Sequence, residues 1–280
     1  MFISFATESK IINHMKSLQR NQDVLALRLA TGQRINSAAD DPAGLAISER
    51  MRAQIRGLRM AQRNAMDGIS LIQTAEGAMN EIHSILQRMR ELSVQAANGT
   101  NTDQDRAYLN EEFQQLKQAV YQFARSTEFN SQPLLDGSKK DKGIHLQIGP
   151  NAGDSLIVTI GDMTDLGLDA LDISTQEGAE KAMKALDDSI NQVSRERSKL
   201  GAIQNRLEHT INYLSTYEEN LTAAESRIRD ADMAQTIMEY TKNQMLLMVS
   251  QVILAQSLRM KRENIMMLLS SLEPRRKYWW

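Results

Sequence analysis

Residues 32–58 read GQRINSAADDPAGLAISERMRAQIRGL, and residues 67–100 read DGISLIQTAEGAMNEIHSILQRMRELSVQAANGT. Asp41 before Pro42 predicts a helix start, because aspartate caps helices and proline is favoured at the first helical position. The residues that follow step by three and four, which is the seam of a heptad repeat. A helix over residues 42–98 would be roughly 85 Å long, so it needs partner helices. The seam positions are Ile55, Leu58, Gln62, Ala65, Ile69, Ile72, Glu76, Met79, Ile82, Leu86 and Met89.

Two shorter helices flank this long one. Residues 1–31 predict a helix that ends at Thr31-Gly32, since glycine commonly terminates helices. Its seam positions are Ile11, Met15, Leu18, Gln22, Leu25 and Leu29. After a second glycine stop at Asn98-Gly99, Thr102 or Asp103 can cap a third helix. The apolar stripe of that helix is Leu109, Phe113, Leu116, Val120 and Phe123.

The second half of the chain predicts another very long helix. Ser174-Thr175-Gln176-Glu177 fits a capping box. The seam then runs through Leu186, Ile190, Val193, Arg197, Leu200, Gln204, Leu207, Ile211, Leu214, Glu218, Leu221, Glu225 and Ile228. The spacing continues in a last helix up to Pro274, through Met233, Ile237, Tyr240, Gln244, Leu247, Gln251, Leu254, Leu258, Lys261, Ile265, Leu268 and Leu272. The polar seam residues leave two interpretations open: they set the register within the chain, or they face neighbouring subunits.

One region alternates as β-strands do. Residues 143–149 and 154–161 place apolar side chains at every second position, and Pro150-Asn151-Ala152-Gly153 joins them as a hairpin. The sequence therefore predicts a mainly α fold: an elongated antiparallel helical bundle or coiled coil with a small β-hairpin at about 143–161. We expect residues 1–31 and 245–280 to form a terminal coiled-coil domain and residues 32–244 a rod-like helical core domain.

Composition excludes several classes of function. The 33 basic and 35 acidic residues are interspersed and give a net charge of −2, which offers no case for binding nucleic acid. Cysteine is absent, so cysteine nucleophiles and cysteine-ligated metals are excluded. The apolar run MLLMVSQVILA from Met245 is too short to span a membrane. The N-terminus, MFISFATESK, lacks the pattern of a cleaved signal peptide.

Nothing in the sequence predicts catalysis. His14, His83, His145 and His209 are scattered, without a second ligand at metal spacing. Asp40-Asp41 is better explained by helix capping than as a catalytic carboxylate pair, and no phosphate loop, nucleophile elbow or HExxH motif occurs. We therefore expect no enzymatic activity, no catalytic residue, no cofactor and no metal.

Residues 245–267 are rich in methionine. Flexible, polarisable methionine side chains suit a promiscuous partner-binding groove. The steps of three and four continue through the segment, however, and favour the interpretation that it is a coiled-coil seam.

Residues 32–58 and 67–100, quoted above, resemble the N-terminal signature of bacterial flagellin. RSTEFNSQPLLDG (125–137), INQVSRERSKLGAIQNRLEHTINYL (190–214) and ENLTAAESRIRDADMAQTIMEYTKNQ (219–244) extend the resemblance into the second half. The close similarity covers roughly residues 32–170 and 186–244. The two ends are atypical: Phe2-Ile3-Ser4-Phe5 stands at the start, and the basic stretch SLRMKRENIMMLLSSLEPRRKYWW stands at the end.

The resemblance implies a structural subunit of the bacterial flagellar filament, polymerising through its terminal helices for motility. The family commonly carries variable outer domains between the two halves, and the interval here is too short for them, so we expect no large outer domains. The alternative is a hook–filament junction protein, or a flagellin-like protein of the same apparatus that forms no long filament. The partners implied are other flagellin subunits, the flagellar export chaperone and the filament cap. The chain would be secreted through the flagellar export apparatus without a cleaved signal peptide.

The resemblance also implies a receptor surface. In flagellins a QRxREL segment is bound by the animal Toll-like receptor for flagellin, assisted by a glutamate of the next helix. The matching residues here are Gln87, Arg88, Leu92 and Glu112. Arg88 and Leu92 are four residues apart, so they share a helix face, and we expect both to be exposed beside the Met89 seam. The alternative is that these residues form a charged helix face that contacts only solvent.

Overall fold

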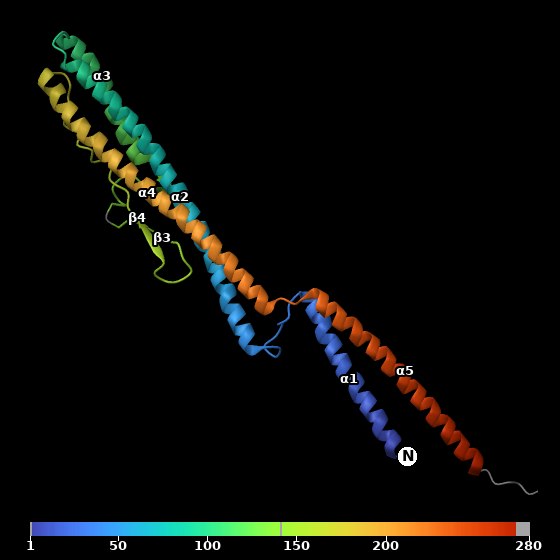
Figure 1. The fold of residues 1–280 in the computed structure, drawn as a ribbon. Coiled ribbons are helices and arrows are strands. Elements are labelled where there is room, and N and C mark those ends of the chain that lie inside the picture. The colour runs from blue at the N-terminus through green and yellow to red at the C-terminus, as the bar shows by residue number, and fades with distance from the viewer. Residues whose placement is uncertain (1, 141, 273–280) are drawn as a thin grey trace, which may run out of the picture. The chain divides into compact units, whose positions relative to one another are not determined.

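The computed structural model describes residues 2–140 and 142–272. In this part of the chain there are five helices: α1 (Phe2–Thr31), α2 (Pro42–Ala97), α3 (Asp103–Ser126), α4 (Gln176–Arg229) and α5 (Met233–Leu272). Two small antiparallel sheets lie between α3 and α4 in sequence (Figure 1). β1 (Glu128–Phe129) pairs with β2 (Gln132–Pro133), and β3 (Ile144–Gln147) pairs with β4 (Ser155–Val158). The mainly α fold with a small hairpin is confirmed.

The helix starts follow from local capping. Asp41 Oδ1 accepts a hydrogen bond of 2.9 Å from the Gly44 amide at the start of α2, as predicted. Thr102 caps α3 in a capping box with Asp105. At the start of α4 the predicted capping box is wrong: Thr175 Oγ1, and not Ser174, accepts from the Gly178 amide at 3.1 Å, and Gly178 has no side chain to return the second bond.

The chain divides into two compact units, and residues 53–221 form one of them. Its main core joins α2, α3, α4 and the β3–β4 hairpin. Every predicted seam position of α2 is buried or half-buried, and so is every one of α4. In α3, Phe113 and Val120 are fully buried, whereas Phe123 is exposed and Ala124 takes the inward position. The predicted α3 stripe is therefore wrong at its last residue.

The hairpin fits closely against α2. Leu156 and Val158 of β4 point into the core. The Leu146 side chain of β3 lies so near Gly68 that it would have to move to admit a Cβ at position 68. Glycine at this helical position therefore lets the hairpin approach α2 closely.

Polar seam residues of this unit pair within the chain. Arg197 Nη2 lies 3.8 Å from Glu76 Oε1, and Arg59 Nε donates to Glu218 Oε1 at 2.6 Å. Both pairs join α2 to α4. The interpretation that these polar residues set the register within the bundle is favoured, because a slip of either helix would separate the charges.

The second unit contains the residues up to Arg52 and those from Thr222 onward. Near the turn at Gly32, whose φ of +69° suits glycine, Arg229 is buried and donates to Glu49 and, at 3.1 Å, to Gln33 Oε1. Burying an arginine requires such partners, since an unpaired buried charge is costly. These bonds tie the end of α4 to the first turns of α2 and to the segment between α1 and α2.

In the same unit α1 and α5 lie side by side (Figure 1). The predicted α1 seam is confirmed: Leu18 and Leu25 are buried, and the other seam residues are half-buried. The predicted α5 seam is only half right. Tyr240, Leu247, Leu254 and Lys261 are correct, whereas Met233, Ile265 and Leu268 are exposed and the side chain of Leu272 lies outside the described part of the chain. The alternate positions from Ile237 to Leu258 shift by one residue, so that the face covered by α1 consists of Thr236, Tyr240, Asn243, Leu247, Ser250, Leu254, Ser257 and Lys261.

The physical reason for this correction lies in the composition of α5. Large apolar residues occur on all of its faces, so steps of three and four can be drawn through more than one apolar row. The row with small polar residues is the one that packs on α1. Ile237, Leu258 and Ile265, assigned to the seam from sequence, are all exposed.

An ion pair and a hydrogen bond join α1 to α5 and define the register of the two helices. Lys261 Nζ donates to Glu8 Oε2 at 2.7 Å, and Ser257 Oγ donates to Oε1 at 3.2 Å. These bonds, with Lys261 first, hold the pKa of Glu8 below its ordinary value of 4.5. A lowered pKa in the paired state stabilises pairing above pH 4.5, and this contribution is lost as the pH falls through the lowered pKa.

We therefore expect spin labels at the exposed Lys10 and Arg259 to give a narrow distance distribution at pH 7 that broadens in acid below pH 4.5. Glu8→Gln should broaden the distribution at pH 7 and remove the acid dependence. The exposed Glu263→Gln on α5 is the matched control and should behave as the parent chain. An unchanged acid transition in Glu8→Gln would contradict the role of this pair.

Candidate functional site

Arg88 lies at the centre of a charged cluster on α2 and α3. Its Nε and Nη2 donate to Glu112 Oε1 at 3.1 and 2.9 Å, and its Nη1 donates to Glu91 Oε2 at 3.1 Å. All three side chains are about half-exposed or more. The hydrogen bonds to Glu112, and next those to Glu91, raise the pKa of Arg88 above its ordinary value. The structure thus brings together Arg88 and Glu112, two of the residues that the family resemblance named.

Gln87 lies beside this cluster and is exposed. Its side-chain amide is 3.0 Å from His83 Nε2, one helical turn earlier. Gln87, Arg88 and Glu112 therefore form one polar, accessible surface, which we call the α2–α3 charged surface.

Leu92 does not belong to that surface. Only 1% of it is exposed, and it is part of the main core. The expectation that Leu92 leans away from the seam is wrong. Because α3 as well as α4 contributes to this core, α2 buries a stripe wider than a simple heptad seam, and Leu92 and Ala96 fall within it.

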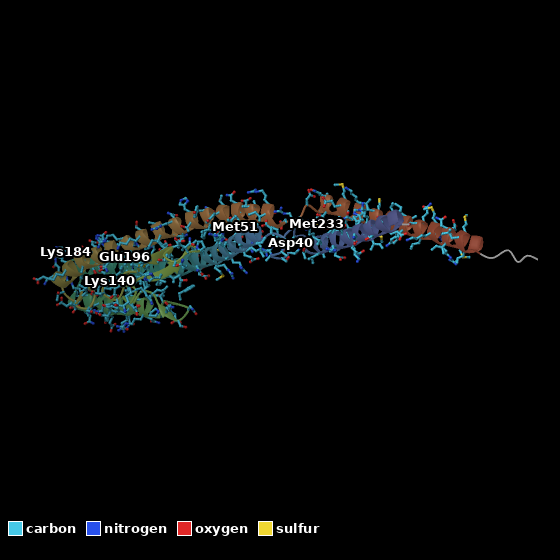
Figure 2. All side chains as sticks on the ribbon, turned by 90° about the horizontal axis from the view of Figure 1, so that it is seen from below. Asp40, Met51, Lys140, Lys184, Glu196 and Met233 are labelled. Carbon is cyan, nitrogen blue, oxygen red and sulfur yellow. The ribbon has the colours of Figure 1, made fainter. Side chains whose placement is uncertain are left out.

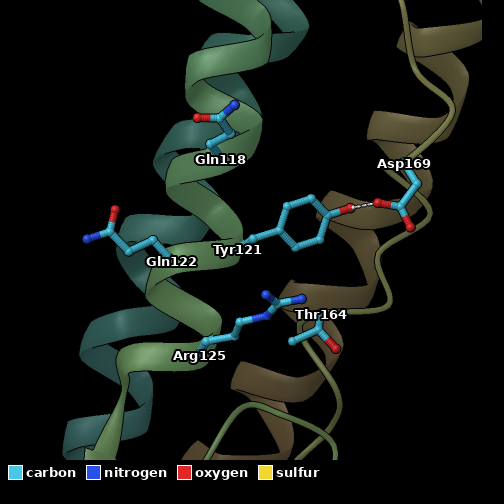
Figure 3. Close-up of a pocket in the computed structure, with 6 residues that line it drawn as sticks. All are labelled: Gln118, Tyr121, Gln122, Arg125, Thr164 and Asp169. Carbon is cyan, nitrogen blue, oxygen red and sulfur yellow. Dashed lines mark hydrogen bonds between the residues drawn. The ribbon is translucent and has the colours of Figure 1, made fainter.

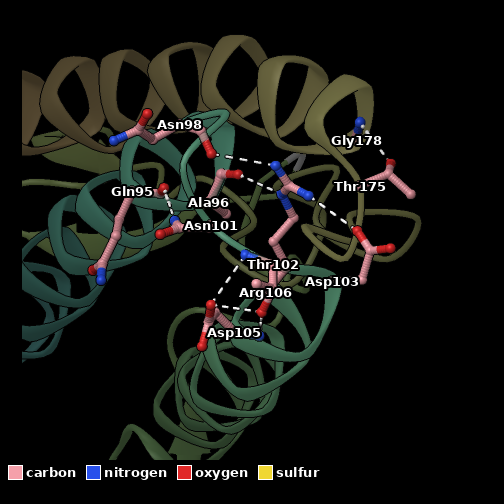
Figure 4. A network of polar contacts seen from close by, with 10 residues as sticks. All are labelled: Gln95, Ala96, Asn98, Asn101, Thr102, Asp103, Asp105, Arg106, Thr175 and Gly178. Atoms are coloured by element: carbon pink, nitrogen blue, oxygen red, sulfur yellow. Dashed lines mark hydrogen bonds and ion pairs between the residues drawn. The ribbon is translucent and has the colours of Figure 1, made fainter.

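Buried Arg106 braces the turn between α2 and α3 (Figure 4). Its Nε donates to the Ala96 carbonyl at 3.0 Å, its Nη2 to the Asn98 carbonyl at 3.2 Å, and its Nη1 to Asp103 Oδ1 at 3.1 Å. The last carbonyls of a helix have no partner within it, so a cation there both satisfies them and complements the helix dipole. Arg106 thereby fixes how α3 returns along α2. No pattern in the sequence indicated this role.

A polar pocket of about 520 Å³ lies between α3 and the segment before α4 (Figure 3). Tyr121 crosses it and donates from its hydroxyl to Asp169 Oδ1 at 2.6 Å. Burial, together with this bond, raises the pKa of Tyr121 to about 12. The Tyr121 hydroxyl is therefore protonated at neutral pH and cannot act as a base or as an activated nucleophile. Its hydrogen bond to Asp169 holds the segment before α4 against α3. The lining residues are Gln118, Tyr121, Gln122, Arg125, Thr164 and Asp169.

No metal-binding group stands out in residues 2–140 and 142–272, where no three histidine, aspartate or glutamate side chains gather suitably. Over the same residues, none of the helices carries an apolar stretch sufficient to cross a membrane.

The most extensive apolar surface is on α5. Residues 243–258 contain no charged residue, yet α1 covers only the narrow face described above. Val252 is 65% exposed, and Met245, Met248, Val249 and Ile253 are also exposed. An apolar patch of this kind on a chain indicates an interaction site. The predicted seam did not indicate this exposed apolar surface. The absence of charged residues over 243–258 is the sequence feature that could have indicated it.

Two family models match the chain. The bacterial flagellin N-terminal helical region matches residues 4–140, and the bacterial flagellin C-terminal helical region matches residues 183–269. The chain belongs to the bacterial flagellin family. The matches reach nearer to both ends than the motifs quoted from the sequence, so the flagellin helical regions include most of α1 and α5.

Relatives of similar length agree with this assignment. The chain is 53% identical to a flagellin of Halalkalibacterium halodurans over 237 residues, which cover 82% of this chain and 85% of that protein. It is 45% identical to a Bacillus subtilis flagellin over 300 residues, covering 94% and 96%. Among solved structures, that of Bacillus cereus flagellin matches with a TM-score of 0.51 and 35% identity, covering 58% of this chain and 94% of that one.

This flagellin is a structural subunit of the bacterial flagellar filament. The relatives that match are named flagellins, which are structural proteins.

The role of Arg106 gives a stability prediction. Arg106→Met removes three bonds of a buried cation, and we expect the free energy of unfolding to fall by about 2–3 kcal/mol, the usual value for charged hydrogen bonds lost from a buried site. The exposed Arg125→Met in the same helix is the matched control, with a change within about 0.5 kcal/mol. Urea unfolding followed by circular dichroism measures both. Equal effects of the two substitutions would show that Arg106 does not brace the turn.

Proposed function

We propose that the chain polymerises with further copies of itself and that α1 and α5 carry the contacts between subunits in the filament. The observation that supports this proposal is the exposed apolar surface of α5. A helix that is apolar on all sides is stable only when it is surrounded, and α1 covers one face. In a filament, the most abundant partners of each subunit are other copies of the same chain.

The absence of charge on α5 also supports another copy of the chain as its partner. The uncharged stretch 243–258 cannot be recognised through ion pairs, so its partner must be apolar in turn. A neighbouring α5 offers such a surface. Burying large apolar side chains contributes about 25 cal/mol per Å² of apolar area, and a helical polymer repeats that contribution at every subunit.

A charge placed in this surface tests the proposal. Val252→Glu puts a carboxylate where an apolar contact is proposed, so we expect seeded polymerisation to be lost. Gln251→Glu is the matched control: it adds the same charge at an exposed polar position one residue earlier and should retain polymerisation. Electron microscopy and sedimentation of the polymer measure both. Filaments formed normally by Val252→Glu would refute assembly through this face of α5.

We also propose partners before assembly. The exposed apolar surface of α5 is an aggregation liability in a free subunit, which supports a flagellar export chaperone that covers it during export through the flagellar export apparatus. The filament cap would be the partner at the site of incorporation. Both proposals rest on the family and on this surface.

Recognition by the animal Toll-like receptor for flagellin is a further proposal, centred on Gln87, Arg88 and Glu112. An exposed arginine held in place by two carboxylates is a suitable anchor, because arginine is enriched among residues that dominate interfaces. Leu92, the fourth residue matching the family motif, is buried and would act by holding α2 in place. Its replacement by alanine would cost roughly 2–5 kcal/mol of folding free energy and cannot report binding alone.

The receptor test therefore uses surface residues only. We expect Gln87→Ala with Arg88→Ala to weaken receptor binding by about 2 kcal/mol or more, as for interface anchors, with helicity unchanged. Arg90→Ala is the matched control, since Arg90 is an equally exposed arginine of α2 that instead pairs with Asp187 at 2.6 Å. Binding measured by titration calorimetry should separate the two variants. Equal affinities in both would exclude the α2–α3 charged surface as the receptor site.

A further inference from the structure

The methionines of this chain are distributed unevenly. Sixteen occur in 280 residues, and seven of them lie in the 40 residues of α5. Every one of the seven is exposed, from 42% for Met233 to 70% for Met267. Met79, Met89 and Met163, in the other unit, are completely buried. In Figure 2 yellow sulfur atoms project from α5. The exposed set is Met233, Met238, Met245, Met248, Met260, Met266 and Met267.

None of these methionines lies on the face that α1 covers. That face consists of Thr236, Tyr240, Asn243, Leu247, Ser250, Leu254, Ser257 and Lys261. A chemical change at the seven sulfurs therefore alters the outer surface of α5 without touching its packing on α1.

Exposed thioethers react with peroxides. One oxygen of hydrogen peroxide is transferred to the sulfur, the O–O bond breaks, and water leaves; the sulfur is oxidised by two electrons and the peroxide is reduced. The product, methionine sulfoxide, is polar where the thioether was apolar, and methionine sulfoxide reductases reverse the step. Sulfoxides disrupt methionine-rich interfaces because the S–O dipole must be desolvated.

We propose that the seven methionines make α5 a redox-sensitive assembly surface. Peroxide converts them to sulfoxides in the free subunit and blocks its polymerisation, while the fold of the subunit is retained. Reduction of the sulfoxides restores assembly. This inference rests on the proposed function, namely that α5 contacts other subunits.

The test compares three chains: the parent, a variant with leucine at all seven α5 methionines, and the control Met60→Leu with Met66→Leu. Leucine keeps the apolar character and approximate volume and favours helix. Met60 and Met66 are about as exposed as the α5 methionines but lie on α2 in the other unit. Each monomer is treated with hydrogen peroxide, freed of it, and seeded with untreated filament fragments. Peptide mass spectrometry measures the sulfoxide at each position.

We expect the treated parent and the treated α2 control to lose seeded polymerisation, and the treated α5 leucine variant to retain it. Circular dichroism should remain unchanged in all three, and a sulfoxide reductase should restore assembly of the parent. Equal loss in the treated α5 leucine variant would overturn the inference, because oxidation would then act elsewhere. So would a parent that polymerises normally with its α5 methionines oxidised.

A second measurement is needed if the α5 leucine variant fails to polymerise even without peroxide treatment. In the parent chain, partial oxidation gives a series of samples in which the loss of polymerisation is compared with the sulfoxide content of each peptide. A loss that follows the α5 peptides supports the inference, and one that follows Met60 and Met66 overturns it. Failure of the proposal that α5 carries the subunit contacts can be distinguished from failure of the redox proposal. Normal filaments formed by Val252→Glu, without any oxidant, would refute the first proposal.

Discussion

Two helices packed on each other can bury only one narrow stripe of each, and this constraint explains both units of the chain. In residues 53–221, α3 and the β3–β4 hairpin cover what the α2 and α4 seams leave open, so Phe113, Leu92 and Val158 share one closed core. In the other unit α1 packs on α5, and the remaining faces of α5 stay apolar and exposed. One unit is satisfied within the chain, and the other is not.

Most of the fold could be predicted because helices and caps are encoded locally. Asp41 and Thr102 marked helix starts through their side-chain oxygens, and Gly32 marked a helix end through its positive φ. The seam rows predicted for α1, α2 and α4 coincide with buried or half-buried positions. The β1–β2 pair was missed because its strands have two residues each. Its turn uses Asn130 and Ser131 at φ of 50° and 61°, without the glycine that usually marks such a hairpin.

The errors at Leu92 and in α5 have a common cause. A heptad count assumes one partner per helix, whereas Leu92 lies where α2 meets a broader core, and α5 has too many apolar rows for the count to select one. Partner number is a property of tertiary structure and not of local spacing. Within the candidate site, Arg88 and Glu112 were selected by the family resemblance, and no local pattern predicted that their side chains pair between α2 and α3. The brace at Arg106 depends on side-chain reach and was not predictable either.

The polar positions of the α1–α5 seam connect structure to assembly. Thr236, Asn243, Ser250 and Ser257 occupy alternate seam positions where large apolar residues would make a strong coiled coil. The pair therefore gains little from its own contact, and Glu8 with Lys261 fixes its register more than its stability. Anything that binds only the paired state stabilises it by mass action. In the assembly that we propose, subunits that cover the outer surface of α5 reinforce the α1–α5 pair, so ordering of the terminal helices and polymerisation are coupled.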